Sequence, residues 1–210
     1  MEPIEELFER YPCLGGSRKE IEQAVAVIIK CYNSGGKVLT CGNGGSCADS
    51  DHIVGELMKG FRKARPLQAG VREELAKAGG KLGDEIAAGL QTPLAAINLC
   101  AHDSLNTAFG NDADPILSYA QQALGYARKN DVFIGISTSG NAKNVVAAGI
   151  AAKAAGASAV GLCGEKPCDM DGFFDCVIHV PETETYRVQE LHLPIYHAIC
   201  IAVEDYFFKD

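Results

Sequence analysis

Two short stretches rich in glycine and hydroxyl residues have the composition of anion-binding turns. They are residues 41–46 (CGNGGS) and residues 137–141 (STSGN). Glycine lets the backbone approach a ligand closely, and hydroxyls and free amides at a helix start donate hydrogen bonds to an anion. A single turn of this composition is equally typical of an ordinary tight turn that is capped by a serine. Two turns, one with three adjacent hydroxyls where a helix cap needs a single one, together predict phosphate binding.

Neither turn has the spacing of a common nucleotide-binding loop. The Gly-Lys-Ser/Thr ending of the Walker loop is missing from both. Gly42, Gly44 and Gly45 do not fit the Gly-x-Gly-x-x-Gly pattern of dinucleotide-binding turns. Nucleotide hydrolysis and dinucleotide redox chemistry are therefore disfavoured.

Metal-ligating residue types recur at helical spacing in two segments. His52 and Glu56 are four residues apart, and Gln189 and His197 are eight apart, so each pair shares one helix face. Two imidazoles, a carboxylate and an amide oxygen can hold a divalent metal such as zinc. Spacing alone favours simpler interpretations: a surface His–Glu pair, a solvated glutamine and a buried histidine. A metal site requires the two segments to meet in space.

The segments around these residues predict a parallel sheet. Five largely apolar runs are typical of strands covered on both faces. They are residues 37–43, 94–100, 131–138, 158–165 and 176–181. Helical patterns occupy residues 18–33, 113–128, 141–155 and about 185–208. This alternation predicts a doubly wound α/β sandwich, in which ligands bind beyond the carboxyl ends of the strands.

The length of 210 residues suits a single domain, residues 1–210, with N-terminal helices in residues 1–35. Residues 66–92 are helix-prone but contain five glycines. We expect a broken helical excursion or lid there, between the first two strands. A mobile surface insertion without a chemical role is the alternative interpretation.

Composition and charge exclude some classes of binding partner for this protein. The formal net charge is -8, which opposes broad binding to nucleic acid or to an anionic membrane. No apolar run reaches the ~20 residues of a membrane-spanning helix, and the acidic N-terminus does not resemble a signal peptide. The nine cysteines are odd in number and scattered. We expect reduced thiols in a cytoplasmic protein.

The two turns, the His52–Glu56 pair and the segment RVQELHLPIYH at 187–197 together resemble the SIS (sugar isomerase) domain family. Within that family the chain is similar to the phosphoheptose isomerases, from its N-terminal helix to its last helix. The resemblance implies a three-layer α/β/α sandwich with a five-stranded parallel sheet and an N-terminal helix. It also implies a homotetramer with sites at the subunit interfaces.

The resemblance further implies roles for individual residues. The implied substrate-binding residues are Asn43, Gly44, Ser46, Ser137, Thr138, Ser139, Asn141 and Gln189, with residues 137–139 holding the phosphate. The implied cofactor is zinc, one divalent ion per site, on His52, Glu56, Gln189 and His197. Glu56 is the implied base and His197 the implied acid. The implied reaction converts sedoheptulose 7-phosphate to D-glycero-D-manno-heptose 7-phosphate, or acts on a related sugar phosphate, through an enediol.

Departures from the family pattern keep two other functions open. Ala142 replaces a serine, Lys59–Gly60 stand near the family's arginine, and Tyr186 stands near an aspartate. One alternative is a non-catalytic sugar-phosphate sensor or regulatory scaffold of the replication-initiation type, and another is an SIS lyase or etherase. The retained set of His52, Glu56, Gln189 and His197 favours the isomerase, because a sensor needs only the phosphate turn.

Overall fold

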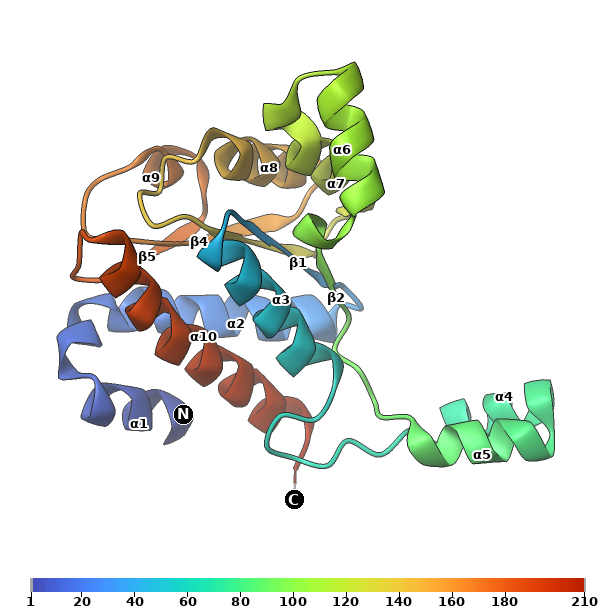
Figure 1. Ribbon diagram of the computed structural model, residues 1–210. Coiled ribbons are helices and arrows are strands. Elements are labelled where there is room, and N and C mark those ends of the chain that lie inside the picture. The colour runs from blue at the N-terminus through green and yellow to red at the C-terminus, as the bar shows by residue number, and fades with distance from the viewer. Residues whose placement is uncertain (1, 210) are drawn as a thin grey trace.

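The computed structural model describes residues 2–209, and its centre is one parallel sheet with the strand order β2-β1-β3-β4-β5 (Figure 1). The strands are β1 (Val38–Gly42), β2 (Ala96–Asn98), β3 (Val132–Ile136), β4 (Ser158–Cys163) and β5 (Cys176–His179). The predicted five-stranded parallel sheet is confirmed. Each strand is shorter than the apolar run that predicted it. The residues at the ends of the runs do not pair with a neighbouring strand.

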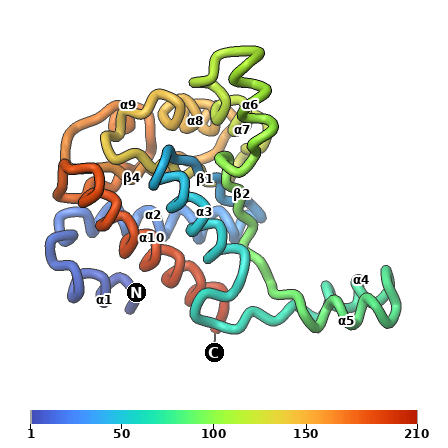
Figure 2. Tube along the Cα trace, in the orientation of Figure 1, coloured from blue at the N-terminus to red at the C-terminus, as the bar shows by residue number. Residues whose placement is uncertain are grey.

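Helices cover both faces of the sheet and complete the predicted three layers (Figures 1 and 2). One face carries α2 (Arg18–Asn33), α3 (Gly45–Met58) and α10 (Thr185–Phe207), with α1 (Glu2–Arg10) packed on α10. The other face carries α7 (Ser118–Tyr126), α8 (Lys143–Ala154) and α9 (Asp169–Phe173), with α6 (Asp103–Asp112) beside them. Because both faces are covered, every residue of β1 and β3 is buried.

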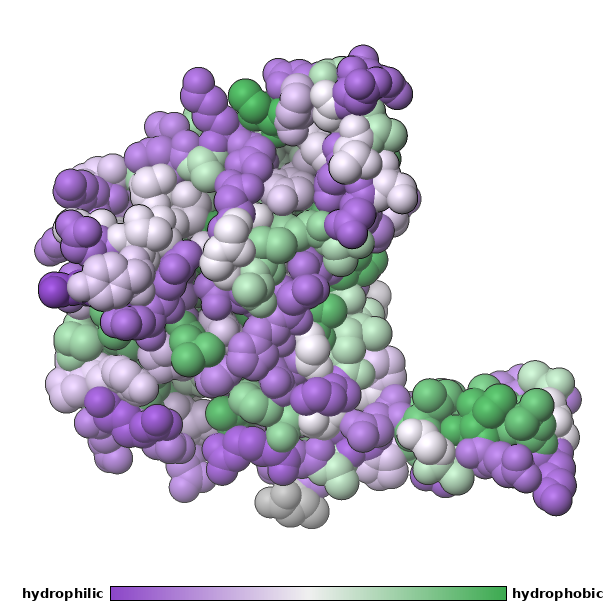
Figure 3. Space-filling view, viewed as in Figure 1, coloured by the Kyte–Doolittle hydropathy of each residue, from purple (hydrophilic) through white to green (hydrophobic). Residues whose placement is uncertain are grey.

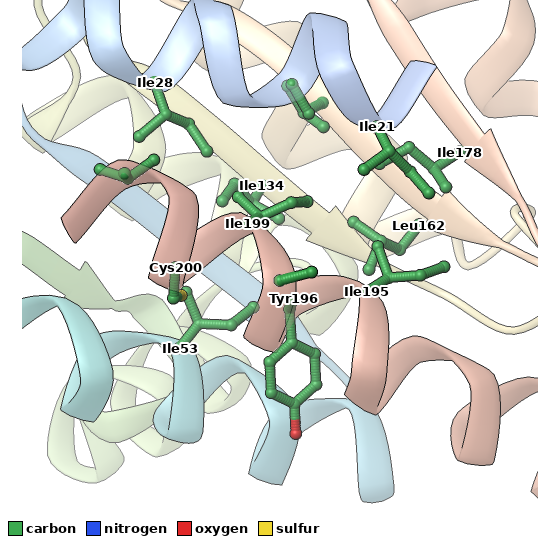
Figure 4. Packing of buried hydrophobic residues seen from close by; sticks show 14 of the residues in the cluster. Ile21, Ile28, Ile53, Ile134, Leu162, Ile178, Ile195, Tyr196, Ile199 and Cys200 are labelled. Carbon is green, nitrogen blue, oxygen red and sulfur yellow. The ribbon is translucent and has the colours of Figure 1, made fainter. Parts of the chain in front are cut away.

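Apolar residues at helical spacing hold the first layer to the sheet. Ile21 and Ile28 of α2 and Ile195 and Ile199 of α10 are each at most 5% exposed. They meet the strand residue Ile134 in one cluster (Figure 4). Fully burying such a side chain contributes about 1.5–3 kcal/mol, so this cluster fixes α10 and its polar residues against the sheet.

The helices differ from the sequence prediction at residues 113–128 and at α6 and α9, which the patterns did not indicate. Residues 113–128 form a short 3-10 turn (Pro115–Leu117) and then α7, rather than one helix. The Asp114 carboxylate accepts a hydrogen bond from the amide of Ile116, which starts the turn at Pro115. The sequence patterns also did not indicate α6, whose described residues include none that is buried.

Between β1 and β2 the chain makes a helical hairpin that projects from the sandwich (Figures 1 and 2). Its helices are α4 (Ala69–Gly79) and α5 (Lys81–Gly89), separated by Gly80 with a φ of +54°. An added Cβ at Gly83 would lie 1.9 Å from the Leu75 carbonyl oxygen, so the two helices touch backbone to backbone there. Figure 3 shows apolar side chains gathered on the projection. The exposed large apolar residues of this segment are Val71, Leu82, Ile86 and Leu90.

No helix within residues 2–209 combines the length and the apolar character needed to cross a bilayer.

A buried ion pair joins the end of α3 to α10. The Arg65 guanidinium and the Glu204 carboxylate are 2.8 Å apart, and both side chains are fully buried. Arg65 also donates to the carbonyl oxygens of Leu57 (2.7 Å) and Glu56 (3.0 Å), which a helix end leaves without partners. The Glu204 carboxylate also accepts hydrogen bonds from the backbone amides of Phe61 and Arg62. Although burial opposes its ionisation, these donors and Arg65 lower the pKa of Glu204.

We predict that Arg65→Met lowers the free energy of unfolding by about 3–5 kcal/mol, because it leaves a buried carboxylate without its partner. Denaturant unfolding measures this loss. The control is Arg10→Met, which breaks an exposed pair with Glu6 and costs at most about 1 kcal/mol. Equal effects of the two substitutions would contradict this account of the buried pair.

Candidate functional site

The two glycine- and hydroxyl-rich turns meet in one pocket. They follow β1 and β3, which are neighbours in the sheet although β2 lies between them in sequence. This is the position where connections leave in opposite directions and parallel sheets bind ligands. The pocket is lined by Asn43, Gly44, Gly45, Ser46, Ile136, Ser137, Thr138, Ser139, Ala142, Thr185 and Gln189. It contains the predicted substrate-binding residues apart from Asn141, which is exposed beside it.

The turn after β3 arranges its hydroxyls at the start of α8. Gly140 has a φ of +67°, which folds the chain back so that its amide donates to the Ser137 carbonyl oxygen. Ser139 Oγ accepts the Asn141 amide at 3.2 Å, and Ser137 Oγ lies 3.4 Å from the Ala142 amide. The two hydroxyl oxygens thus face backbone amides at the start of the helix. An anion bound at a helix N-terminus uses such amides, because the helix dipole favours negative charge there.

Asn144 joins the two turns, a contact that the sequence patterns did not reveal. Its amide nitrogen donates to Asn43 Oδ1 at 2.8 Å, and the Asn43 amide nitrogen donates to Asn144 Oδ1 at 2.9 Å. The two residues are 101 positions apart, so neither spacing nor composition signals their pairing. The reciprocal bonds fix the width of the pocket between the turns.

His52, Glu56 and His197 come together between α3 and α10. His52 Nε2 lies 3.3 Å from Glu56 Oε1 and 3.4 Å from His197 Nε2. The second carboxylate oxygen of Glu56 pairs with Lys59 Nζ at 3.1 Å. Phe61 packs its ring against His197, with ring centroids 5.4 Å apart. The structure thus unites three of the four predicted metal-binding residues.

Gln189 lies apart from these three residues, over the first turn. An added Cβ at Gly45 would be 2.5 Å from Gln189 Nε2, so the side chain rests against the glycine. Eight residues of helix separate Gln189 from His197, a rise of about 12 Å. His197 lines a different hollow, which α1 and α10 form with residues such as Leu7 and Arg10.

Tyr196 and Asp49 set the orientation of His52. The Tyr196 hydroxyl donates to Asp49 Oδ1 at 3.2 Å and lies 3.0 Å from His52 Nδ1. With the hydroxyl proton on the carboxylate, the hydroxyl oxygen is free to accept a proton from Nδ1, and in that tautomer the Nε2 lone pair faces Glu56 and His197. Figure 4 shows the Tyr196 ring leaving the apolar cluster with the hydroxyl at its far end. Neither residue carried a sequence signal, because tyrosine on an apolar helix face is typical of a core position.

The three residues have the donors of a zinc site. Tetrahedral zinc with nitrogen and oxygen ligands has ligand–ligand edges of about 3.3–3.4 Å. The two distances at His52 match this length, whereas the ligand atoms of Glu56 and His197 lie more than 4.8 Å apart, so the third edge is open in this arrangement. Metal-binding imidazoles usually have their second ring nitrogen in a hydrogen bond, and the Tyr196 hydroxyl provides that contact for His52. Burial and the neighbouring His52 lower the pKa of His197, so His197 stays neutral, as a metal ligand must be, to a lower pH than a free imidazole does.

Sequence and structure comparisons identify similar proteins. Models of the SIS domain match residues 14–81 and residues 109–202. The phosphoheptose isomerase of Clostridium acetobutylicum is 35% identical over 192 residues, which are 91% of this chain and 85% of that protein. Phosphoheptose isomerase 2 of Campylobacter jejuni is 37% identical over 188 residues, 90% of this chain and 81% of that protein. The structure of a phosphoheptose isomerase from Neisseria gonorrhoeae matches with a TM-score of 0.71 and 29% identity, covering 89% of this chain and 86% of that chain.

We predict that Tyr196→Phe weakens zinc binding at His52 by about 10–100-fold, because the imidazole loses the group that selects its tautomer. Competition with a chelator of known zinc affinity measures the change. Tyr126→Phe, a half-exposed tyrosine stacked on His102, is the matched control and leaves the affinity unchanged. Unaltered affinity in Tyr196→Phe would show that the hydroxyl does not orient His52.

Proposed function

We propose that this chain, which belongs to the phosphoheptose isomerase family of SIS-domain proteins, interconverts a ketose phosphate and an aldose phosphate. The proposed reaction turns sedoheptulose 7-phosphate into D-glycero-D-manno-heptose 7-phosphate. The observation that carries it is the single pocket in which both turns meet at the ends of β1 and β3. The pocket offers hydroxyls and helix-start amides for a phosphate and side-chain amides for a sugar.

The pocket residues divide into two proposed roles. Ser137, Thr138 and Ser139 hold the phosphate, because they sit at the positive end of α8. Asn43, Gly44, Ser46, Asn141 and Gln189 contact the sugar, in our proposal. Ala142 supplies no hydroxyl at the same turn, so the phosphate relies on the three preceding side chains and on backbone amides.

Glu56 and His197 are the proposed base and acid. The reaction takes a proton from the carbon beside the carbonyl and returns one to the neighbouring carbon through an enediol. Glu56 accepts the first proton, and Lys59 at 3.1 Å from its other oxygen holds the carboxylate in place. His197 delivers the second proton from the one ring N–H that a neutral imidazole keeps. His52, Glu56 and His197 would hold zinc, which would supply polarisation of the substrate carbonyl, whereas Gln189, the fourth predicted ligand, lies apart from them within one chain.

We further propose that the complete site forms between copies of the chain in a cytoplasmic homotetramer. Within one chain Gln189 faces the sugar-phosphate pocket, whereas His197 faces the hollow beside α1. A second copy that covers this hollow would bring the phosphate of one chain near the acid and base of the other. The exposed apolar residues of the α4–α5 hairpin offer a contact surface for such a copy.

The catalytic proposal predicts that Glu56→Gln and His197→Ala each lower kcat by about 10²–10⁴-fold in the isomerisation of sedoheptulose 7-phosphate. Six-carbon sugar phosphates tested in parallel define the substrate. Glu22→Gln, an exposed carboxylate on α2, is the matched control and retains full activity. Tight binding of the sugar phosphate without turnover by the wild type would favour the sensor instead, and full activity of Glu56→Gln would exclude the assigned base.

The assembly proposal predicts a tetrameric mass for the wild type in light scattering. Ile86→Glu, with an apolar side chain 43% exposed on α5, shifts the mass toward smaller species because it places a charge on the contact surface. Lys81→Glu at the start of the same helix tests charge alone and keeps the wild-type mass. A monomeric wild type would contradict the proposal.

A further inference from the structure

We propose a second metal site, formed by Cys163, Cys168 and His179 and suited to zinc, behind the turn that follows β3. Among residues 2–209, this is the group of His, Cys, Asp or Glu side chains that brings three ligand atoms within 4.8 Å of one another. The proposal does not depend on the isomerase reaction, since these residues lie outside the pocket and outside the His52 cluster.

The fold brings the three side chains together from three elements. Cys163 ends β4 and His179 ends β5, and the two are register partners in the parallel ladder. Cys168 immediately precedes α9, where the chain returns from β4. Cys163 is fully buried, whereas Cys168 and His179 are partly exposed, so an ion can enter from solvent.

The separations of the ligand atoms agree with tetrahedral zinc. The two sulfur atoms are 3.8 Å apart, and Cys163 Sγ lies 3.4 Å from His179 Nδ1. Zinc bonded to thiolate and imidazole gives edges of about 3.8 Å between sulfurs and about 3.6 Å between sulfur and nitrogen. Two sulfurs and one nitrogen favour a borderline-soft cation over magnesium or calcium, which prefer oxygen.

Asp171 provides the support that metal-binding histidines usually have. Its Oδ1 lies 2.8 Å from His179 Nε2, and its Oδ2 accepts the Cys168 amide at 2.8 Å. One carboxylate thereby orients two of the three ligands. With Nε2 held by Asp171, Nδ1 is the nitrogen left for the ion, in the carboxylate–histidine–metal arrangement. His179 Nδ1 also lies 2.8 Å from the Gly164 carbonyl oxygen, a contact that an ion bound at Nδ1 would replace.

The site lies against the proposed phosphate-binding turn. An added Cβ at Gly140 would be 2.2 Å from Cys168 Sγ, so the sulfur rests on the turn. The Gly164 amide donates to the Thr138 carbonyl oxygen at 3.0 Å, and the Asp169 amide donates to Asn141 Oδ1 at 2.7 Å. An ion here joins β4, β5 and the start of α9 directly behind the hydroxyls of the turn, and so holds the turn in place.

Cobalt tests the site separately from the His52 cluster, because only thiolate ligands give sulfur-to-cobalt charge-transfer absorption. We expect this absorption to saturate at one Co²⁺ per chain in the purified full-length protein, and to persist in His52→Ala. It disappears in Cys168→Ser, whose circular dichroism stays that of the wild type, and persists in Cys13→Ser, the control at an exposed cysteine. Absence of the band in the wild type, or its persistence in Cys168→Ser, would overturn the proposal.

Two further measurements test the Cys163–Cys168–His179 site independently of cobalt absorption. Asp171→Asn, which retains both cysteines, weakens zinc binding at this site by about 10–100-fold when measured in the His52→Ala background. Thiol titration of the denatured, unreduced protein gives nine free thiols if the pair is kept for a metal. A Cys163–Cys168 disulfide would remove two of them and would overturn the metal assignment.

Discussion

The buried pair of Arg65 and Glu204 is the interaction on which the arrangement of the acid and base depends. Glu56 lies on α3 and His197 on α10, and the apolar cluster holds both helices against the sheet. Arg65 adds a directional link between them, because it binds carbonyl oxygens at the end of α3 and a carboxylate of α10 together. Such a pair gains little net free energy over apolar residues, but it accepts one geometry only, because any other leaves a buried charge without a partner.

The pocket between the turns depends instead on topology. In the strand order β2-β1-β3-β4-β5, the chain leaves β1 toward one edge and β3 toward the other, so the helices that follow diverge. A space therefore opens where both turns end, and the mutual hydrogen bonds of Asn43 and Asn144 set its width. The sheet therefore positions the residues of the proposed phosphate pocket, whereas the pair of helices α3 and α10 positions the proposed acid and base.

Much of the fold could be predicted from the sequence, because buried parallel strands are apolar along their whole length. All five strands and the helices α2, α8 and α10 lie where the patterns placed them. Helix α6 was not predicted, because none of its residues is buried and it has no apolar face for a pattern to reveal. The turn at Pro115 was predicted as part of a helix. The hydrogen bond from the Ile116 amide to the Asp114 carboxylate forms it, and such a local bond produces no pattern of apolar residues in the sequence.

The candidate site was predictable only as far as residue types allow. Gly, Ser and Thr in two turns and His52 with Glu56 signal chemistry by type and spacing. Asp49, Tyr196 and Asn144 do not, because they act through contacts across more than a hundred residues. Cys163 and Cys168 likewise read as small apolar residues until β5 brings His179 beside them.

The α4–α5 hairpin carries a thermodynamic consequence of its own. Its helices have 11 and 9 residues, shorter than the ~12–15 at which an isolated helix becomes marginally stable in water. Their backbone contact at Gly83 adds little apolar burial, and no residue of α4 is buried. The arm therefore has a low local cost of opening and exchanges its amide hydrogens readily, so its order reports directly on whatever surface it touches.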